Sequence, residues 1–260
     1  MKAKLDIAKS WNQVSDTWQK RIQPLFSRGD LLWGTYGPWE RDVKLISPVR
    51  GKRVLVAGCG SAPDVGWLMK HGAKSAVGID ISSRQLQFAR ERMKSANLKA
   101  EFIQKDLDKL SKNQFKAGTF ELVISNYALQ YVRDLPRLFE VLAYFLRPGG
   151  KFVFSFDHPV STAVGEKVLK RGKQTHVDYL NERIQHWSFS DWNASGDRKV
   201  SAYSYHRTVS SIYNALVRAG FTIEKILEPK PIMKGGVGNT RKYEAAKRIP
   251  ETIILVSKKK

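Results

Sequence analysis

A short glycine turn early in the chain has the residue types of a ligand-binding loop. The segment Val54–Asp64 consists of an apolar run, the turn itself and the start of a helix. Gly58 and Gly60 carry no Cβ atom, so the backbone there can approach a ligand closely. A helix that begins near Pro63 would direct its free N–H groups and its positive dipole end at the same space. Such turns also occur at ordinary strand-to-helix junctions, so other residues must decide whether this one binds a ligand.

Two aspartates end the next two apolar runs and could bind the sugar and the base of a nucleoside. Asp80 stands 20 residues after Gly60, where a carboxylate can accept hydrogen bonds from both hydroxyls of a ribose. Asp106 follows the third apolar run, where a carboxylate could accept a hydrogen bond from an adenine amino group. Either aspartate alone could be a solvated loop or cap residue. Because each one ends a successive predicted strand, the pair and the glycine turn together predict an adenosine site.

The residues after the glycines narrow the choice of nucleotide. The dinucleotide fingerprint Gly-x-Gly-x-x-Gly has a glycine at its sixth position, where this chain has Pro63. Proline has no N–H group and more bulk than glycine, so this helix cannot present itself to a pyrophosphate in the usual way. The sequence contains no Gly-x-x-x-x-Gly-Lys-Ser/Thr loop, which excludes a P-loop enzyme.

The elements that must position these residues are short strands that alternate with helices. Such an alternation predicts βαβ units and a parallel sheet. Ser82 and Gln85 form a capping box at the start of one helix, while Asp134 caps another helix that Pro148-Gly149-Gly150 ends. The predicted strands are Arg53–Ala57, Ser75–Ile79, Ala100–Gln104, Leu122–Ser125 and Lys151–Phe156.

The regions before and after this alternation of strands and helices have different patterns. The chain therefore divides into four parts. Residues 1–50 mix a helical pattern with tryptophans and predict a cap, residues 51–157 form the core, residues 158–207 form an inserted lid, and residues 208–260 complete the core sheet. The first helix of the cap is predicted from about Asp6 to Ile22, before Pro24. The remaining predictions are a hairpin of Glu182–Phe189 and Lys199–His206, a helix at Val209–Ala219, strands at Phe221–Leu227 and Thr252–Ser257, and a loop with Gly235, Gly236 and Gly238.

The composition favours a folded protein in a reducing compartment. The 260 residues are 42% hydrophobic and include 12 Phe, 9 Tyr and 7 Trp, which excludes disorder of the whole chain. Cys59 is the only cysteine, so no internal disulfide forms. No apolar run reaches the roughly 18 residues of a membrane span, and Met1–Asp6 lacks the apolar stretch of a secretory signal. We therefore expect a cytoplasmic protein.

The formal net charge of +21 is a strong bias with more than one explanation. Such a field attracts polyanions, including RNA, acidic membranes and small phosphorylated or carboxylated molecules. The basic residues are dispersed apart from Lys258-Lys259-Lys260, and dispersed charge is more typical of a solvated surface than of a docking face. A small substrate is therefore favoured over nucleic acid, which stays open as a partner, and the charge leaves room for an anionic substrate.

In combination these motifs resemble the class I S-adenosylmethionine-dependent methyltransferases, over residues 30–157 and 203–257. The resemblance implies an α/β, Rossmann-like fold. Its seven-stranded, mostly parallel sheet has an antiparallel last strand, helices on both faces, an N-terminal helical cap and an inserted β-hairpin lid. Tyr36-Gly37-Pro38, Asp157-His158-Pro159 and Tyr205–Thr208 further resemble bacterial small-molecule enzymes related to the ubiquinone/menaquinone C-methyltransferase group. The family motifs are Val54–Ala62, Val77–Ser82, Gln104–Leu107, Phe120–Asp134 and Leu146–Gly150.

The resemblance implies S-adenosylmethionine as the cofactor and transfer of its methyl group to a small-molecule acceptor by direct displacement. An RNA- or ribosome-directed methyltransferase is the alternative that the net charge suggests. The implied cofactor-binding residues are Tyr36, Ala57, Gly58, Gly60, Ser61, Ala62, Asp80, Ile81, Gln85, Asp106, Leu107, Ser125 and Asn126. The residues expected to wall the substrate pocket are Trp33, Tyr127, Tyr131 and Trp187.

His158 and His206 are the leading candidates for a catalytic base. His158 follows the fifth predicted strand, at the edge where open α/β sheets bind ligands, and His206 lies where the hairpin rejoins the core. Each could equally be a buried histidine with a structural partner. Alignment of the reactants contributes about 7–11 kcal/mol and a base about 3–5 kcal/mol, so the reaction needs no obligatory base. No cluster of His, Cys, Asp and Glu has metal-ligand spacing, so we expect no metal.

Two positions depart from the family pattern. Val56 stands where the family usually has an acidic residue at the end of strand one, and Ala62 replaces a third glycine. Without that carboxylate, the methionine amino group is left with Ser125, Asn126 or the carbonyl groups of Ala57 and Ser125 as acceptors. Val56 is also the one feature that supports a third reading, a non-enzymatic binder that keeps the fold.

Overall fold

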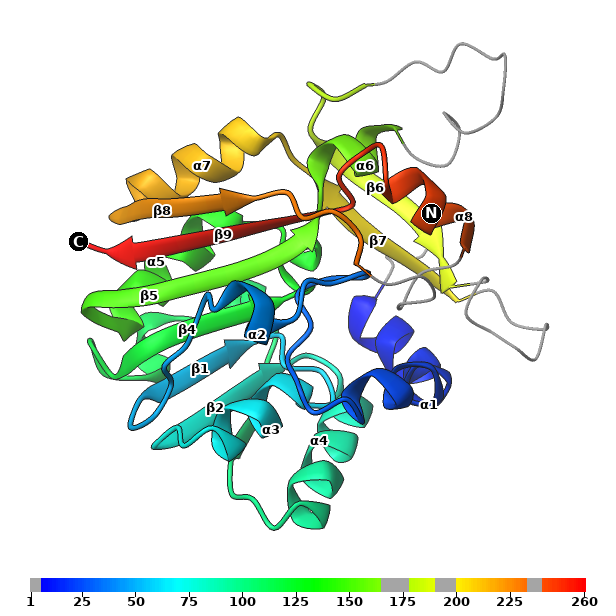
Figure 1. The fold of residues 1–260 in the computed structure, drawn as a ribbon. Coiled ribbons are helices and arrows are strands. Elements are labelled where there is room, and N and C mark those ends of the chain that lie inside the picture. Colours follow the sequence, from blue (N-terminus) through cyan, green and yellow to red (C-terminus); the bar gives the residue numbers. More distant parts are fainter. Residues whose placement is uncertain (1–5, 165–177, 190–199, 233–239) are drawn as a thin grey trace.

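A seven-stranded sheet forms the centre of the protein in the computed structural model, which describes residues 6–164, 178–189, 200–232 and 240–260. The strand order is β3-β2-β1-β4-β5-β9-β8 (Figure 1). Neighbours from β3 to β5 are parallel, whereas β9 is antiparallel to both β5 and β8. The strands are β1 (Arg53–Ala57), β2 (Ser75–Asp80), β3 (Glu101–Gln104), β4 (Phe120–Asn126), β5 (Leu146–Asp157), β8 (Phe221–Leu227) and β9 (Thr252–Lys259). The predicted fold class, with its antiparallel last strand, is confirmed.

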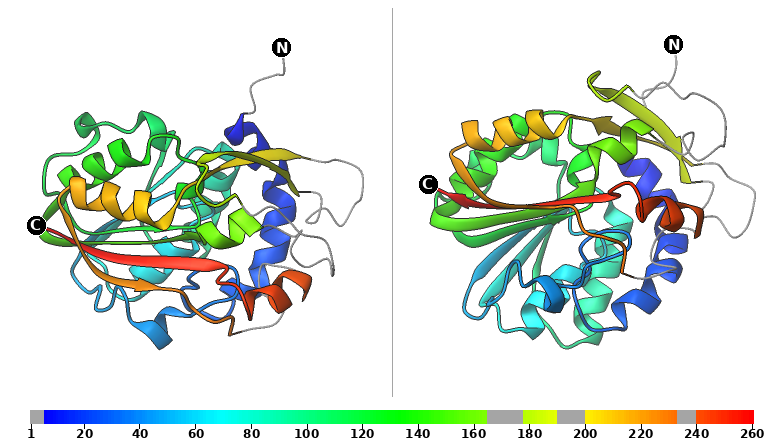
Figure 2. Two further views of the ribbon diagram at one scale, coloured as in Figure 1. Left: turned by 90° about the horizontal axis from the view of Figure 1, so that it is seen from above. Right: turned by 45° about the horizontal axis from the view of Figure 1, so that its top comes forward.

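Helices cover both faces of this sheet (Figure 2). One layer contains α5 and α7, and the opposite layer contains α3 and α4. The helices are α1 (Ile7–Phe26), α2 (Glu40–Val43), α3 (Pro63–Lys70), α4 (Ser83–Ser95), α5 (Leu135–Phe145), α6 (Pro159–Val164), α7 (Val209–Arg218) and α8 (Thr240–Ala246), with short 3-10 turns at η1 (Leu107–Lys109), η2 (Lys112–Gln114) and η3 (Leu129–Tyr131). Within the described parts of the chain, no helix combines the length and the apolar character needed to cross a membrane.

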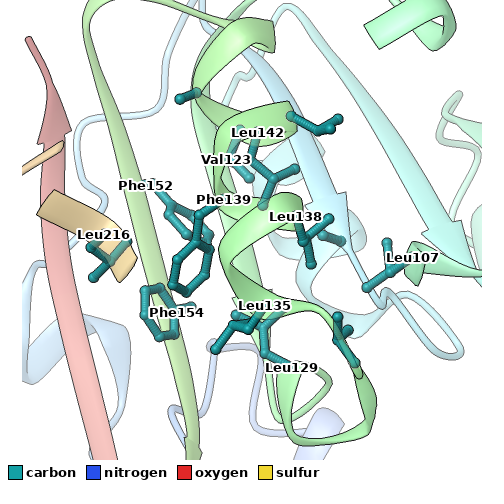
Figure 3. Packing of buried hydrophobic residues seen from close by; sticks show 14 of the residues in the cluster. Leu107, Val123, Leu129, Leu135, Leu138, Phe139, Leu142, Phe152, Phe154 and Leu216 are labelled. Atoms are coloured by element: carbon teal, nitrogen blue, oxygen red, sulfur yellow. The ribbon is translucent and has the colours of Figure 1, made fainter. Parts of the chain in front are cut away.

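The side chains of each central strand alternate between the two helical layers. In β1, Leu55 packs into the cluster that contains α5 and α7, while Val54 and Val56 pack into the cluster that contains α3 and α4. Figure 3 shows the first cluster, in which Phe139 of α5 lies against the aromatic rings of β5. A strand buried on both faces reads as a continuous apolar run, as β1 does. Full burial of each such side chain contributes roughly 1.5–3 kcal/mol.

The polar residues predicted to start helices do so in the structure. The Ser82 hydroxyl accepts a hydrogen bond of 3.1 Å from the backbone N–H of Gln85 at the start of α4. The Asp134 carboxylate accepts a bond of 3.1 Å from the Arg137 N–H at the start of α5. These caps satisfy N–H groups that have no partner within the helix, and they fix where the loops after β2 and β4 end.

Two predicted boundaries are wrong for identifiable reasons. Helix α1 continues past Pro24 to Phe26, because the Ser27 N–H bonds to the Gln23 carbonyl at 3.1 Å and closes the last turn around the proline. Helix α5 ends at Phe145, and Pro148-Gly149-Gly150 lies within β5. There the pairing with β4 jumps from Leu146 to Lys151, so the proline and glycines form an irregular bulge at the start of the strand rather than a turn before it.

The inserted hairpin is present as an antiparallel pair, β6 (Arg183–Ser188) and β7 (Ser201–His206). Its connecting residues, and the predicted glycine loop at 235–238, lie outside the described residues. The helices α6 and α8 were not predicted. Figures 1 and 2 show α1, α6, α8 and the hairpin gathered beyond the carboxyl ends of the parallel strands, which is where open α/β sheets bind ligands.

Candidate active site

A cavity of about 230 Å³ lies at the carboxyl ends of β1, β2 and β4. It brings together the glycine turn, Asp80 and Asp106, which are far apart in the sequence. Its outer wall comes from α1 and from the loop that precedes α2. The predicted cofactor-binding residues that line it are Gly58, Gly60, Ser61, Asp80, Ile81, Gln85, Asp106, Leu107 and Asn126.

The glycine turn has a backbone shape that side chains rarely adopt. Gly58 has a φ angle of 76° and Gly60 one of 51°, both in the left-handed region. A Cβ atom on Gly58 would come within 2.1 Å of the Cβ of Ala128, so no larger residue fits there. Ala62 also has a positive φ of 60°. The position where the family has its third glycine therefore keeps the same backbone shape with alanine in it.

Asp80 is held in place by backbone donors from two directions. Its Oδ2 accepts the N–H of Gly60 at 2.8 Å, and its Oδ1 accepts the N–H of Ser82 at 2.8 Å. Burial raises the pKa of the Asp80 carboxyl, while these backbone hydrogen bonds act to lower it. A carboxylate has about four lone-pair sites, so both oxygens can still accept hydrogen bonds from a ligand in the cavity.

Asp106 stands beyond β3 and starts the short turn η1. Its Oδ1 accepts the N–H of Asp108 at 2.9 Å, and the residue lines the cavity beside Leu107. Because β3 is the neighbour of β2, Asp106 and Asp80 lie at adjacent strand ends. The residues predicted for the sugar and the base therefore lie at neighbouring positions along the edge of the sheet.

Asp64 is a cavity residue that sequence reasoning did not assign to the site. It belongs to the first turn of α3 and is only 7% exposed. Burial raises the pKa of its carboxyl to about 7, while the nearby amide of Asn126 acts to lower it. An acidic residue directly after a glycine turn, in a chain that lacks the usual acid at Val56, was the signal available in the sequence.

The predicted acceptors for an amino group differ in their surroundings. The Ser125 hydroxyl donates to the Ala57 carbonyl at 2.7 Å, and both residues are fully buried and outside the cavity lining. Asn126 lines the cavity. Its Nδ2 donates to the Leu32 carbonyl at 2.7 Å, and its Oδ1 accepts the hydroxyl of Ser155 at 2.7 Å. Of these candidates, Asn126 is the one whose side chain the structure brings to the cavity.

Gln85 lines the cavity and also fastens the cap helix to the core. Its Nε2 donates to the Ser15 hydroxyl at 3.0 Å, and its Oε1 accepts from Gln19 at 3.1 Å. Asn12 adds a third contact, since its Oδ1 accepts the Ser82 hydroxyl at 2.7 Å. Helix α1 is therefore joined to the start of α4 by side-chain hydrogen bonds along one face.

The side of α1 that lines the cavity is apolar. Its residues were not among the predicted site residues. Trp11 and Trp18 pack edge to face with centroids 5.9 Å apart, and Trp11 also packs against Tyr131 at 5.9 Å. Their spacing of seven residues, two turns of a helix, was the sequence signal. The α1 residues that line the cavity are Ile7, Trp11, Trp18, Ile22, Leu25 and Phe26.

The predicted substrate-wall residues separate into two groups. Tyr127 and Tyr131 line the cavity, and the Tyr127 hydroxyl pairs with Thr252 Oγ1 at 2.6 Å. Trp187 packs behind Tyr131 with centroids 6.4 Å apart and is outside the lining. Trp33 is fully buried, and its Nε1 donates to Glu40 at 2.9 Å. Trp33 therefore stabilises the loop before α2 and does not face the cavity.

Tyr36 and Ala62, both expected near the cofactor, are buried but outside the cavity lining. The ring of Tyr36 packs edge to face on Tyr243 with centroids 5.5 Å apart. Its carbonyl accepts the N–H of Ile232 at 3.0 Å. Tyr36 therefore connects the loop before α2 with the C-terminal part of the chain.

Both candidate histidines have structural partners. His158 is 2% exposed, its Nε2 pairs with Glu228 Oε1 at 2.7 Å, and its Nδ1 accepts the N–H of Val160 at 3.1 Å. His206 is also 2% exposed, between Thr162 Oγ1 and the Tyr179 carbonyl, each at 2.8 Å. Neither ring lines the cavity. A catalytic role for them stays a prediction that this geometry does not favour.

The charged residues that line the cavity, within the described parts of the chain, are all acidic: Asp30, Asp64, Asp80 and Asp106. This contrasts with the formal charge of +21 for the whole chain. Asp30 already has a basic neighbour, since its Oδ2 lies 3.8 Å from the Arg41 Nε. The excess positive charge is therefore carried elsewhere on the molecule, and the cavity itself favours cations.

Comparison with known proteins places this site in a family. Residues 54–150 match the family model described as a methyltransferase domain. The crystal structure of an S-adenosylmethionine-dependent methyltransferase from Mesorhizobium loti is similar, with a TM-score of 0.66 and 31% identity, covering 85% of this chain and 97% of that chain.

Two further relatives carry names that include an acceptor. A ubiquinone biosynthesis O-methyltransferase from Coxiella burnetii is 26% identical over 189 residues, which are 64% of this chain and 77% of that protein. Phosphoethanolamine N-methyltransferase 1 from Arabidopsis thaliana is 24% identical over 176 residues, which are 66% of this chain and 35% of that protein. One relative methylates oxygen and the other nitrogen, so the comparisons do not select the acceptor atom. Together with the fold and the motif residues in the cavity, they show that this chain belongs to the S-adenosylmethionine-dependent methyltransferases, with S-adenosylmethionine as its methyl donor.

Proposed function

We propose that the enzyme methylates a small, largely apolar acceptor, neutral or cationic, inside the cavity between α1 and the glycine turn. The observation that carries this proposal is the composition of the lining. Aromatic and aliphatic side chains from α1 face the predicted cofactor residues, and the charged lining residues are all acidic in the described chain. The cavity has a cofactor end, at the glycine turn, Asp80 and Asp106, and an acceptor end, at the aromatic residues of α1 and Tyr131.

The residues present fit S-adenosylmethionine. Gly58 and Gly60 line the cavity with positive φ angles and present no side chain to a ligand there, and Gly58 must be glycine because Ala128 fills the Cβ position. Asp80 would accept hydrogen bonds from the ribose hydroxyls, and Asp106 from the adenine amino group. The bound cofactor supplies the electrophilic methyl group, and the protein supplies placement of the acceptor. Placement of this kind contributes about 7–11 kcal/mol to lowering a barrier.

The acceptor end favours apolar or positively charged groups over anions. A carboxylated or phosphorylated molecule would need a basic partner, and the described lining residues include no Lys, Arg or His. Aromatic faces such as those of Trp11, Trp18 and Tyr131 attract cations within about 6 Å of the ring centroid. An amine or a neutral aromatic molecule is therefore the substrate class that this cavity supports, in place of the anionic substrate that the net charge suggested.

The total charge is compatible with an RNA-directed methyltransferase, but the residues around the cavity do not favour one. Phosphate contacts require basic residues around the entrance to the catalytic centre. The side chains that enclose this cavity are instead apolar ones from α1 and Tyr131 beside the hairpin. The cavity volume of about 230 Å³ also suits a compact acceptor better than a polymer.

A transfer assay with methyl-tritiated S-adenosylmethionine tests this proposal. The purified enzyme is incubated separately with fractionated metabolite extract and with total RNA, and the Asp80→Asn variant serves as the site-directed control. We expect label in small, amine-containing or aromatic metabolites, and its loss in the variant. Label in RNA alone would overturn the small-molecule proposal in favour of the alternative, and label only in anionic metabolites would overturn the substrate class.

A further inference from the structure

The carboxylate of Asp64 is buried beside the cavity without a basic partner. Asp64 is 7% exposed and lines the cavity. Among the described residues, the ion pairs do not include it. Asn126, whose amide acts to lower the pKa of this carboxyl, is neutral, and its own hydrogen bonds go to Leu32 and Ser155. A buried carboxylate without a compensating cation is costly, so its position is explained if a cation from a ligand completes the pair.

The strand order places Asp64 at the end of the cavity opposite the adenosine residues. Along the sheet the order is β3-β2-β1-β4, with Asp106 after β3 and Asp80 at the end of β2. Asn126, which lines the cavity with Asp64 and acts to lower the pKa of that carboxyl, is the last residue of β4. A ligand whose adenine and ribose lie at β3 and β2 would cross the glycine turn after β1 and reach β4 with its other end. In S-adenosylmethionine that other end is the amino acid, with its ammonium group.

Val56 stands where the family usually has an acidic residue, so a negative charge for the ammonium group must come from another position. It is fully buried in the apolar cluster that also contains Ala62 and Val65, the residues around the start of α3. An acid on the strand is therefore replaced by an aliphatic side chain packed against α3. Asp64 stands between Ala62 and Val65 and presents its carboxylate to the cavity from the helix side.

We propose that Asp64 binds the ammonium group of the methionine portion of S-adenosylmethionine, in place of the acidic residue that strand one lacks. This inference rests on the proposed function of the cavity. The nearby amide of Asn126 acts to lower the pKa of the carboxyl and so favours its ionised form. The positive end of the α3 dipole stabilises the ionised form of a carboxylate in the first turn, so the helix supports the pairing.

Calorimetric titration with ligands that differ only at the amino-acid end tests this assignment. S-adenosylhomocysteine carries both the ammonium and the carboxylate, its decarboxylated analogue keeps only the ammonium, and methylthioadenosine has neither. For Asp64→Asn we expect affinity for the first two to fall about 30-fold or more, as when one partner of a buried charge pair is removed. Affinity for methylthioadenosine should change less than about threefold, which also shows that the variant is folded.

Two further variants separate this inference from the proposed function. Asp42→Asn removes an exposed carboxylate in the first turn of α2, outside the cavity lining, and it should leave all three affinities within about threefold. Asp80→Asn should weaken all three ligands alike. Equal loss of all three ligands in Asp64→Asn, or no loss of any, overturns the role of Asp64 while the cavity remains the cofactor site. Failure of the wild-type protein to bind any of the three overturns the proposed function itself.

Discussion

The backbone N–H of Gly60 donates a hydrogen bond of 2.8 Å to Oδ2 of Asp80. This bond joins the turn after β1 to the end of β2, two segments that sequence reasoning treated as separate motifs. The carboxylate is therefore oriented by the loop that approaches the ligand. A substitution in one segment should therefore alter the conformation of the other.

Replacing Asp80 with asparagine should lower affinity for S-adenosylhomocysteine about 10–100-fold. The variant retains one acceptor oxygen where the carboxylate has two, so either the Gly60 or the Ser82 N–H loses its partner along with a ligand hydroxyl. Hydrogen bonds to charged groups contribute about 1.5–3 kcal/mol. Isothermal titration calorimetry measures the change, with Glu91→Gln on the exposed face of α4 as a matched control. Affinity within threefold of wild type would place the ribose elsewhere.

Binding of S-adenosylhomocysteine should strengthen as the pH rises through about 7. Burial raises the pKa of Asp64 to about 7 in the ligand-free protein, and an ammonium group pairs with the ionised form. Below that pH the carboxyl must first lose its proton, so binding is weaker and releases protons to the buffer. Asp80, whose pKa burial also raises, acts in the same direction. Titrations at pH 6 and pH 8 in two buffers of different ionisation enthalpy measure both effects, and Asp64→Asn should reduce them. A pH-independent affinity would contradict this account.

Glu40 should be among the residues whose loss destabilises the cap most. Its fully buried carboxylate accepts hydrogen bonds from Trp33 Nε1 at 2.9 Å and from the N–H groups of Leu45, Ile46 and Ser47 at 3.1, 3.0 and 3.1 Å. Glu40→Ala leaves these donors buried without an acceptor, at a cost of about 1–3 kcal/mol for each unmet group. We expect a loss of about 3 kcal/mol or more in the free energy of urea unfolding.

Glu224→Ala provides the comparison for that measurement. Its carboxylate pairs with Lys151 at 3.6 Å on the surface of the sheet edge, and exposed pairs contribute about 0–1 kcal/mol. The two variants should therefore differ by about 2 kcal/mol or more. Equal effects would mean that the Glu40 hydrogen bonds do not hold the loop around Trp33.

The ionisation of His158 should make the free energy of unfolding depend on pH. Burial lowers the pKa of this imidazole below its ordinary value, with the bond to Glu228 acting against that shift. A lowered pKa in the folded state gives stability that is present above about pH 6.5, the unfolded value, and is lost as the pH falls through the folded value. His158→Gln should thus cost about 1–2 kcal/mol at pH 8 and less at pH 5. Exposed His186→Gln should show no such change. A cost that grows toward pH 5 would contradict the burial argument.

The strands and the cofactor turn could be predicted because local sequence determines them. Apolar runs buried on both faces, separated by caps such as Ser82 and Asp134, specify β1, β2, β4 and the later part of β5 without knowledge of distant partners. The first strand was predicted with the observed bounds, Arg53–Ala57. The predicted end of α1 failed because Pro24 does not stop the helix: the Ser27 N–H still bonds to the Gln23 carbonyl, and Leu25 in the last turn is buried beside the cavity.

The partners of individual polar side chains could not be predicted, since they come from distant segments. His158 meets Glu228, 70 residues away, and His206 meets Thr162, 44 residues away. No local pattern distinguishes such pairs from a free base at a sheet edge. Asp64 was overlooked for the opposite reason, because an acidic residue in the first turn of a helix is an ordinary dipole partner. Only its burial beside the cavity sets it apart.

A crystal structure with bound S-adenosylhomocysteine tests the central claim most directly. The account predicts ligand density in the cavity beside the Gly58–Gly60 turn, with the adenine near Asp106, the ribose hydroxyls on Asp80 and the amino group near Asp64. Density for the nucleoside at another surface, with this cavity left empty at saturating ligand, would contradict it.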